Sequence, residues 1–66
     1  MTEPRLSDEE VYVLALLATG VTLDVAARRV DLSERTLRRR VRAVCDRIGV
    51  DTPIEAVVWA AKRDLI

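Results

Sequence analysis

Histidine and phenylalanine are absent from these 66 residues, and cysteine occurs once, as Cys45. Without histidine and with a single thiol, the chain lacks the groups for a Cys/His zinc site, imidazole catalysis or an internal disulfide. No nucleophile with a base and no phosphate-binding loop is present, so the sequence predicts neither an enzyme nor a cofactor. We expect Cys45 to be a reduced, partly buried small side chain of a cytoplasmic protein.

Long apolar runs are also lacking. The longest, residues 11–18, has 8 residues, whereas a helix needs about 17 to 25 to span a bilayer. Glu3 and Asp8 lie where a secretory signal would have a basic and then an apolar stretch. We therefore expect a cytoplasmic protein with no membrane partner. The length fits one small domain with a thin core, which leaves no room for a large cleft, and we expect no small-molecule ligand.

Net charge is zero, with 11 basic and 11 acidic residues, but the charges are unevenly distributed. Residues 1–27 carry a net charge of −4 and residues 48–66 a net charge of −1. The segment 28–47 has eight arginines against three acidic residues, a net charge of +5. Arginine makes bidentate contacts with phosphate and guanine, so this segment indicates a polyanionic partner despite the neutral total.

Start and stop signals divide the chain into four predicted helices at about 8–19, 23–30, 34–48 and 53–64. Ser7 with Glu10 has the spacing of a capping box, and Gly20 follows as a stop. Thr22 precedes the second helix as a candidate cap. No segment alternates with a period of two, so the fold class is all-α, a four-helix bundle-like domain.

The third and fourth predicted helices have equally clear boundaries. Ser33 is a candidate cap for the third helix, and Gly49 follows its end. Thr52 and Glu55 have the spacing of a second capping box, with Pro53 in the first turn. Only a short turn separates the second and third helices, which predicts a steep crossing between them.

The third helix has two contrasting faces. Four apolar residues fall on one stripe that should face the core: Leu37, Val41, Val44 and Ile48. Four arginines project from the opposite side: Arg35, Arg38, Arg39 and Arg42. The stripe is too short for a coiled coil. A merely solvated face usually interleaves charges of both signs, whereas no acid lies between the first and last of these arginines. The short predicted helix 23–30, the tight turn and the longer arginine-faced helix 34–48 together have the helix-turn-helix arrangement. In this motif the latter helix enters the major groove of DNA.

Individual residues sharpen this interpretation. The most specific stretch is Ser33-x-x-Thr36-Leu37-Arg38, with Ile48-Gly49-Val50 ten residues later. Further matching residues are Leu6-Ser7, Glu10, Val13-Leu14, Leu16-Leu17-Ala18, Gly20-Val21-Thr22, Ala27, Val30, Val41 and Ala56. Over about residues 6–66 the sequence resembles the LuxR/FixJ-type DNA-binding domain. In that family the fourth helix mediates symmetric dimerisation on DNA, so the resemblance implies a homodimer.

The resemblance and the charged face together give a set of candidate contacts with double-stranded DNA. Base edges would be read by Arg38, Arg39, Arg42 and Arg35. The DNA backbone would be contacted by Thr36, Arg40, Arg47, Arg28, Arg29, Ser33 and Thr22. A dimer interface would use Glu55, Val58, Trp59 and Lys62, since Ala56, Val57, Ala60 and Ala61 can pack inward. The alternative for Trp59 is that it closes the core.

Three departures from the family pattern affect DNA affinity. Arg40 stands where the family usually has histidine, Asp24 where it often has lysine, and Pro53 where it frequently has arginine. Asp24 would repel phosphate at the start of the second helix. These departures predict modest affinity or an unusual target site.

The sequence thus predicts specific double-stranded DNA binding by the output domain of a bacterial transcription regulator, or by a stand-alone one. Family members usually carry an N-terminal receiver or ligand-sensing domain, which these residues do not include. One alternative is a module similar to sigma-factor region four, which would dock on RNA polymerase. Another is a protein-interaction module that binds a partner through its acidic first helix or its fourth helix.

Overall fold

In a computed structural model, residues 4–66 are described, and they form α1 (Asp8–Ala18), α2 (Leu23–Arg29), α3 (Glu34–Ile48) and α4 (Pro53–Lys62). No strand occurs in this part of the chain, which confirms the all-α prediction. The first and second helices end one residue earlier than predicted and the fourth ends two residues earlier. Asp64 ends the last helix because its φ of 58° is in the left-handed region.

Two of the predicted helix starts are capped as the sequence indicates. Ser7 and Glu10 form a complete capping box: the Ser7 N–H donates to the Glu10 carboxylate at 2.8 Å, and the Glu10 N–H donates to Ser7 Oγ at 3.2 Å. Ser33 Oγ accepts from the Thr36 N–H at 3.1 Å. These caps fix where α1 and α3 begin.

The other two starts differ from the prediction. Thr52 Oγ1 accepts from the Glu55 N–H at 3.2 Å, but the Glu55 carboxylate accepts from the Thr52 hydroxyl and not from its N–H, so this capping box is only half formed. Thr22 occupies the cap position of α2 but makes no side-chain capping bond. Its hydroxyl donates to the Asp24 carboxylate instead.

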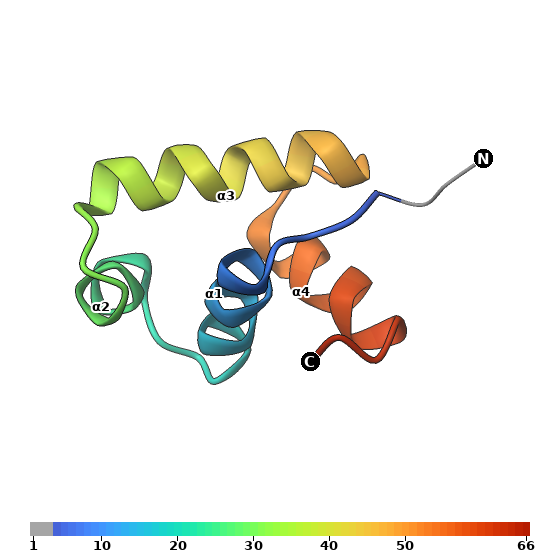
Figure 1. Cartoon of the computed structure of the whole chain (residues 1–66), viewed down its shortest axis with the longest axis horizontal. Coiled ribbons are helices and arrows are strands. Elements are labelled where there is room, and N and C mark those ends of the chain that lie inside the picture. Colours follow the sequence, from blue (N-terminus) through green and yellow to red (C-terminus); the bar gives the residue numbers. More distant parts are fainter. Residues whose placement is uncertain (1–3) are drawn as a thin grey trace.

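The helices are arranged with α3 lying lengthwise across the other three (Figure 1). Among these, α1 packs against α4 and against α2, while α3 contacts both α2 and α4. The core takes residues from every helix: Val13, Leu14, Leu16, Ala26, Ala27, Leu37, Val41, Val44, Cys45, Ala56 and Ala60. All four buried residues of α2 and α4 are alanines, which lets these two helices approach their neighbours closely.

The predicted apolar stripe of α3 lies in this core. Leu37, Val41 and Val44 are buried, and Ile48 packs against them while partly exposed. Cys45 is more deeply buried than expected, with 2% of its surface exposed. Burial raises the pKa of the Cys45 thiol, which disfavours the thiolate form. Within residues 4–66, no helix has the length and apolar character needed to cross a membrane.

A tight turn joins α2 to α3. Asp31 adopts a left-handed conformation with φ 59°, and the Leu32 N–H donates to the Ala27 carbonyl at 2.9 Å. This 6→1 hydrogen bond closes the end of α2 and reverses the chain within a few residues. The predicted helix-turn-helix geometry depends on this turn, because it sets α3 across α2.

Candidate nucleic-acid interface

The outward face of α3 carries four exposed arginines: Arg35, Arg38, Arg39 and Arg42. They lie opposite the buried stripe, as the helical period predicts. Arg35 and Arg39 have no ion-pair partner among the described residues. Four cations held on one exposed helix face concentrate positive charge there.

Two acidic residues, Glu34 and Asp46, flank this arginine face. The sequence pattern did not single them out. Arg38 lies 3.5 Å from the Glu34 carboxylate, and Arg42 lies 3.7 Å from the Asp46 carboxylate, each one helical turn away. Exposed pairs of this spacing contribute only about 0.3 to 0.5 kcal/mol. A phosphate or a base edge can therefore replace either acid at little cost.

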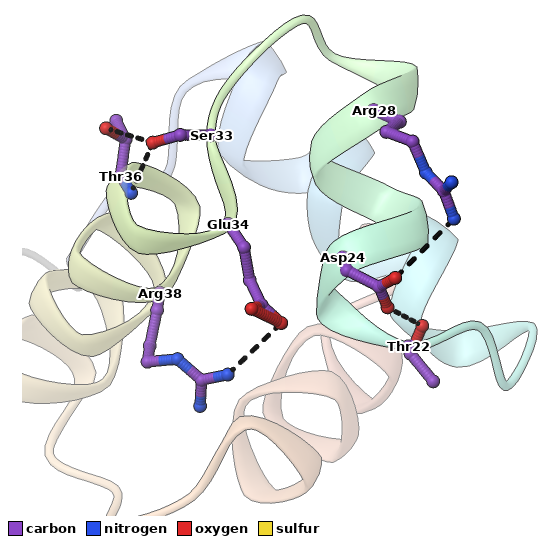
Figure 2. Close-up of polar contacts among 7 residues, drawn as sticks. All are labelled: Thr22, Asp24, Arg28, Ser33, Glu34, Thr36 and Arg38. Carbon is purple, nitrogen blue, oxygen red and sulfur yellow. Dashed lines mark hydrogen bonds and ion pairs between the residues drawn. The ribbon is translucent and has the colours of Figure 1, made fainter.

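At the start of α2, three side chains form a small polar cluster (Figure 2). Asp24 accepts from the Thr22 hydroxyl and lies 3.5 Å from the Arg28 guanidinium. The Thr22 hydrogen bond, with help from Arg28, lowers the pKa of the Asp24 carboxyl below its ordinary value. Since the Thr22 hydroxyl already donates to Asp24, the sequence-based assignment of Thr22 to phosphate is weakened. Arg29 remains exposed, without an ion-pair partner in the described chain.

Ser33 and Thr36 form a second polar pair, at the start of α3 (Figure 2). The Ser33 hydroxyl donates to Thr36 Oγ1 at 2.9 Å and also accepts from the Thr36 N–H. Both hydrogen-bonding roles of Ser33 are thus used inside the protein. The Thr36 hydroxyl keeps its own hydrogen available, which suits the predicted backbone contact of Thr36 better than that of Ser33.

Arg40 and Arg47 lie on the side of α3 that faces α1. Arg47 approaches the Glu10 carboxylate to 2.6 Å, and Arg40 donates to Glu9. Partial burial raises the pKa of Glu10, but hydrogen bonds from the Ser7 N–H and from Arg47 outweigh it and hold the pKa below its ordinary value. These two arginines therefore link α3 to α1. The sequence pattern did not reveal this role, because Glu9 and Arg40 are 31 residues apart.

On α4, the structure revises the expected exposed face. Trp59 is only partly exposed and packs against the core, and the Arg63 guanidinium lies 4.0 Å from the centre of its ring. Trp59 therefore packs as the alternative prediction expected, closing the core with part of its ring still exposed. Ala61, expected to pack inward, is exposed. Val58 is exposed as expected, with 46% of its surface accessible.

The most exposed large apolar residue of α4 is one that the sequence did not single out, Ile54, at 74%. Ile54 and Val58 are four residues apart, and together with Val57 they line a groove whose other wall includes Leu17 and Val21. The i, i+4 spacing of two aliphatic residues was the available signal. It was obscured because the whole stretch 54–61 is apolar apart from Glu55.

Two curated proteins are similar to this chain. The transcriptional regulatory protein YdfI of Bacillus subtilis (strain 168) is 30% identical over 64 residues, which cover 97% of this chain and 30% of that protein. The bialaphos biosynthetic pathway regulatory protein of Streptomyces hygroscopicus is 36% identical over 61 residues, 92% of this chain and 24% of that protein. No protein-family model and no solved structure matches. The chain thus spans less than a third of either relative, and both relatives are named as regulatory proteins.

Proposed function

We propose that this chain is a sequence-specific, double-stranded DNA-binding module of a bacterial transcription regulator, with α3 as its recognition helix. The observation that carries the proposal is the division of α3 into a buried aliphatic stripe and an exposed arginine face. The tight turn after α2 supports it, because it leaves that face free to enter a major groove. The names of both relatives are consistent with such a regulator.

In this mechanism, phosphate contacts orient the module and α3 reads the sequence. Arg28 and Arg29 on α2 would contact the backbone, and Thr36 would donate to a phosphate. The base-reading set is Arg38, Arg39, Arg42 and Arg35. Arg40 and Arg47 would reach phosphate only on leaving Glu9 and Glu10, so their first role is to hold α3 against α1. No catalytic step or cofactor enters the mechanism.

Substitution of one base-reading arginine tests the proposal. Arg38→Ala should cost about 1 to 3 kcal/mol per half-site and relax the preference at one base pair, because a bidentate contact with guanine is lost. Arg29→Ala is the matched control, an exposed arginine of the same domain assigned to the backbone. It should weaken binding to all sequences alike. Binding to a selected and to a random duplex is compared for each variant, and equal losses on both duplexes for both variants would contradict the assignment.

We further propose that the module is of LuxR/FixJ type and dimerises on DNA through α4. The exposed strip of Ile54 and Val58 supports a contact at a two-fold axis, since each apolar residue buried there counts twice. Glu55, Lys62 and the partly exposed edge of Trp59 flank the strip and would form its rim. A contact with RNA polymerase would be made by the whole regulator, and dimerisation on DNA does not require it.

Val58→Asp should separate the dimer contact from DNA binding. A buried acid without a partner should disrupt the interface and reduce affinity about tenfold or more for a duplex with two half-sites about 10 base pairs apart. The control is Tyr12→Asp, which places the same charge on a residue of α1 that is 50% exposed. Both variants should bind a single half-site with equal affinity. Equal behaviour of the two variants on paired half-sites, measured by gel shift, would remove Val58 from the interface.

A further inference from the structure

Glu34 is an acid at the very start of the proposed recognition helix. It is the first residue of α3, and its carboxylate lies 3.5 Å from the Arg38 guanidinium. Both side chains are largely open to solvent, with exposed fractions of 48% for Glu34 and 64% for Arg38. Figure 2 shows the two side chains directed toward one another from successive turns of α3. They therefore present their head groups to a ligand together.

This placement needs an explanation, because an acid at a helix N-terminus opposes the binding of phosphate there. The favourable effect of an acid on the helix dipole accounts for its presence in the first turn. The i, i+4 spacing brings its carboxylate to Arg38, but neither effect requires an acid beside a base-reading arginine. An exposed pair of this kind adds little to folding.

The chemistry of base edges supplies the explanation. Arginine donates to O6 and N7 of guanine, whereas a glutamate carboxylate accepts from the N4 amino group of cytosine. The two head groups are 3.5 Å apart, close to the rise of about 3.4 Å between stacked base pairs. Neighbouring base pairs can therefore be reached by the two side chains at once.

We propose that Glu34 is a specificity-determining residue, which accepts a hydrogen bond from the N4 amino group of a cytosine in the base pair next to the guanine read by Arg38. This inference rests on the proposed DNA-binding function. The carboxylate has acceptors only, so it is repelled by O6 and N7 of guanine and by O4 of thymine at the same position. Adenine also presents an amino donor, N6, but its N7 acceptor lies beside it and repels the carboxylate. Glu34 thus favours cytosine over the other bases, at a cost in general affinity.

Selection from random duplex DNA tests this with wild-type protein, Glu34→Gln and Glu34→Ala. The wild type should show a cytosine preference of about tenfold or more at one position. Glu34→Ala should abolish that preference and strengthen binding to random DNA. Glu34→Gln should shift it toward adenine, the base that glutamine pairs with through N6 and N7. Asp46→Asn is the matched control, since it removes an exposed acid of α3 that also pairs with an arginine. It should leave every base preference unchanged.

The outcomes separate the two proposals. Unchanged preferences in both Glu34 variants, with wild type still selecting a defined sequence, would overturn the inference and leave the proposed function standing. Loss of selectivity only at the guanine under Arg38 would also overturn it, since Glu34 would then act through Arg38 alone. Failure of the wild type to select any sequence would overturn the proposed function itself. Glu34→Gln preserves the size of the side chain, so its helical circular dichroism should match that of the wild type.

Discussion

Binding to a two-half-site duplex is expected to weaken by about 10³ to 10⁵-fold between 50 and 200 mM salt. Each phosphate neutralised by a cation releases counterions, and the logarithm of affinity falls with a slope of about −0.9 per phosphate. Arg28 and Arg29 would contact the backbone, and the exposed arginines of α3 would also lie against the polyanion, so two copies of the module bring enough cations to release counterions from about 6 to 10 phosphates. The measurement is a titration of labelled duplex at a series of salt concentrations.

The structure indicates which arginines determine the slope. Arg29 is exposed and has no ion-pair partner in the described chain, so Arg29→Ala should make the slope shallower by about one unit per subunit. Arg47 lies 2.6 Å from Glu10 and is already neutralised, so Arg47→Ala should change the slope less. A flat salt dependence, or no duplex binding at low salt, would instead favour a protein-interaction module that uses α1 or α4.

The elements predictable from sequence were those governed by local rules. The apolar stripe of α3 repeats with the helical period, and Ser7, Ser33 and Gly49 bound their helices through interactions within a few residues. These features depend on neighbours along the chain, so their spacing is visible in the sequence. Three predicted helix ends were one or two residues too late. The last turn depends on which residue adopts a non-helical conformation, as Asp64 does with its left-handed φ.

Features of the site that span different helices could not be predicted in this way. Arg40 and Arg47 were predicted to contact the DNA backbone, and the packing of α1 against α3 gives them Glu9 and Glu10 as partners within the protein. The orientation of Trp59 likewise depends on how α4 packs, and it is partly covered by the core and by Arg63. Thr22 fits the cap pattern, but the nearby Asp24 carboxylate competes successfully for its hydroxyl. Each of these features arises where tertiary packing or a competing acceptor outweighs the local pattern.

Leu37→Ala should remove a large part of the stability of the domain. Leu37 is the first residue of the buried stripe and is 1% exposed, so truncation leaves a cavity between α3 and the other helices. Such a change costs about 2 to 5 kcal/mol. A domain of 66 residues has a free energy of unfolding of about 3 to 10 kcal/mol at the usual values per residue.

Urea unfolding followed by circular dichroism measures this loss. Ile54→Ala is the matched control, because it truncates an aliphatic residue that is 74% exposed and should change the free energy of unfolding by less than about 0.5 kcal/mol. The Leu37→Ala variant also tests how the arginine face is held. Arg38, Arg39 and Arg42 alternate along α3 with the buried Leu37 and Val41, so their shared orientation depends on the stripe being packed. Specific DNA binding by Leu37→Ala should therefore fall in parallel with its folded fraction and return when the temperature is lowered. A folded Leu37→Ala variant of wild-type stability would show that the stripe does not anchor α3.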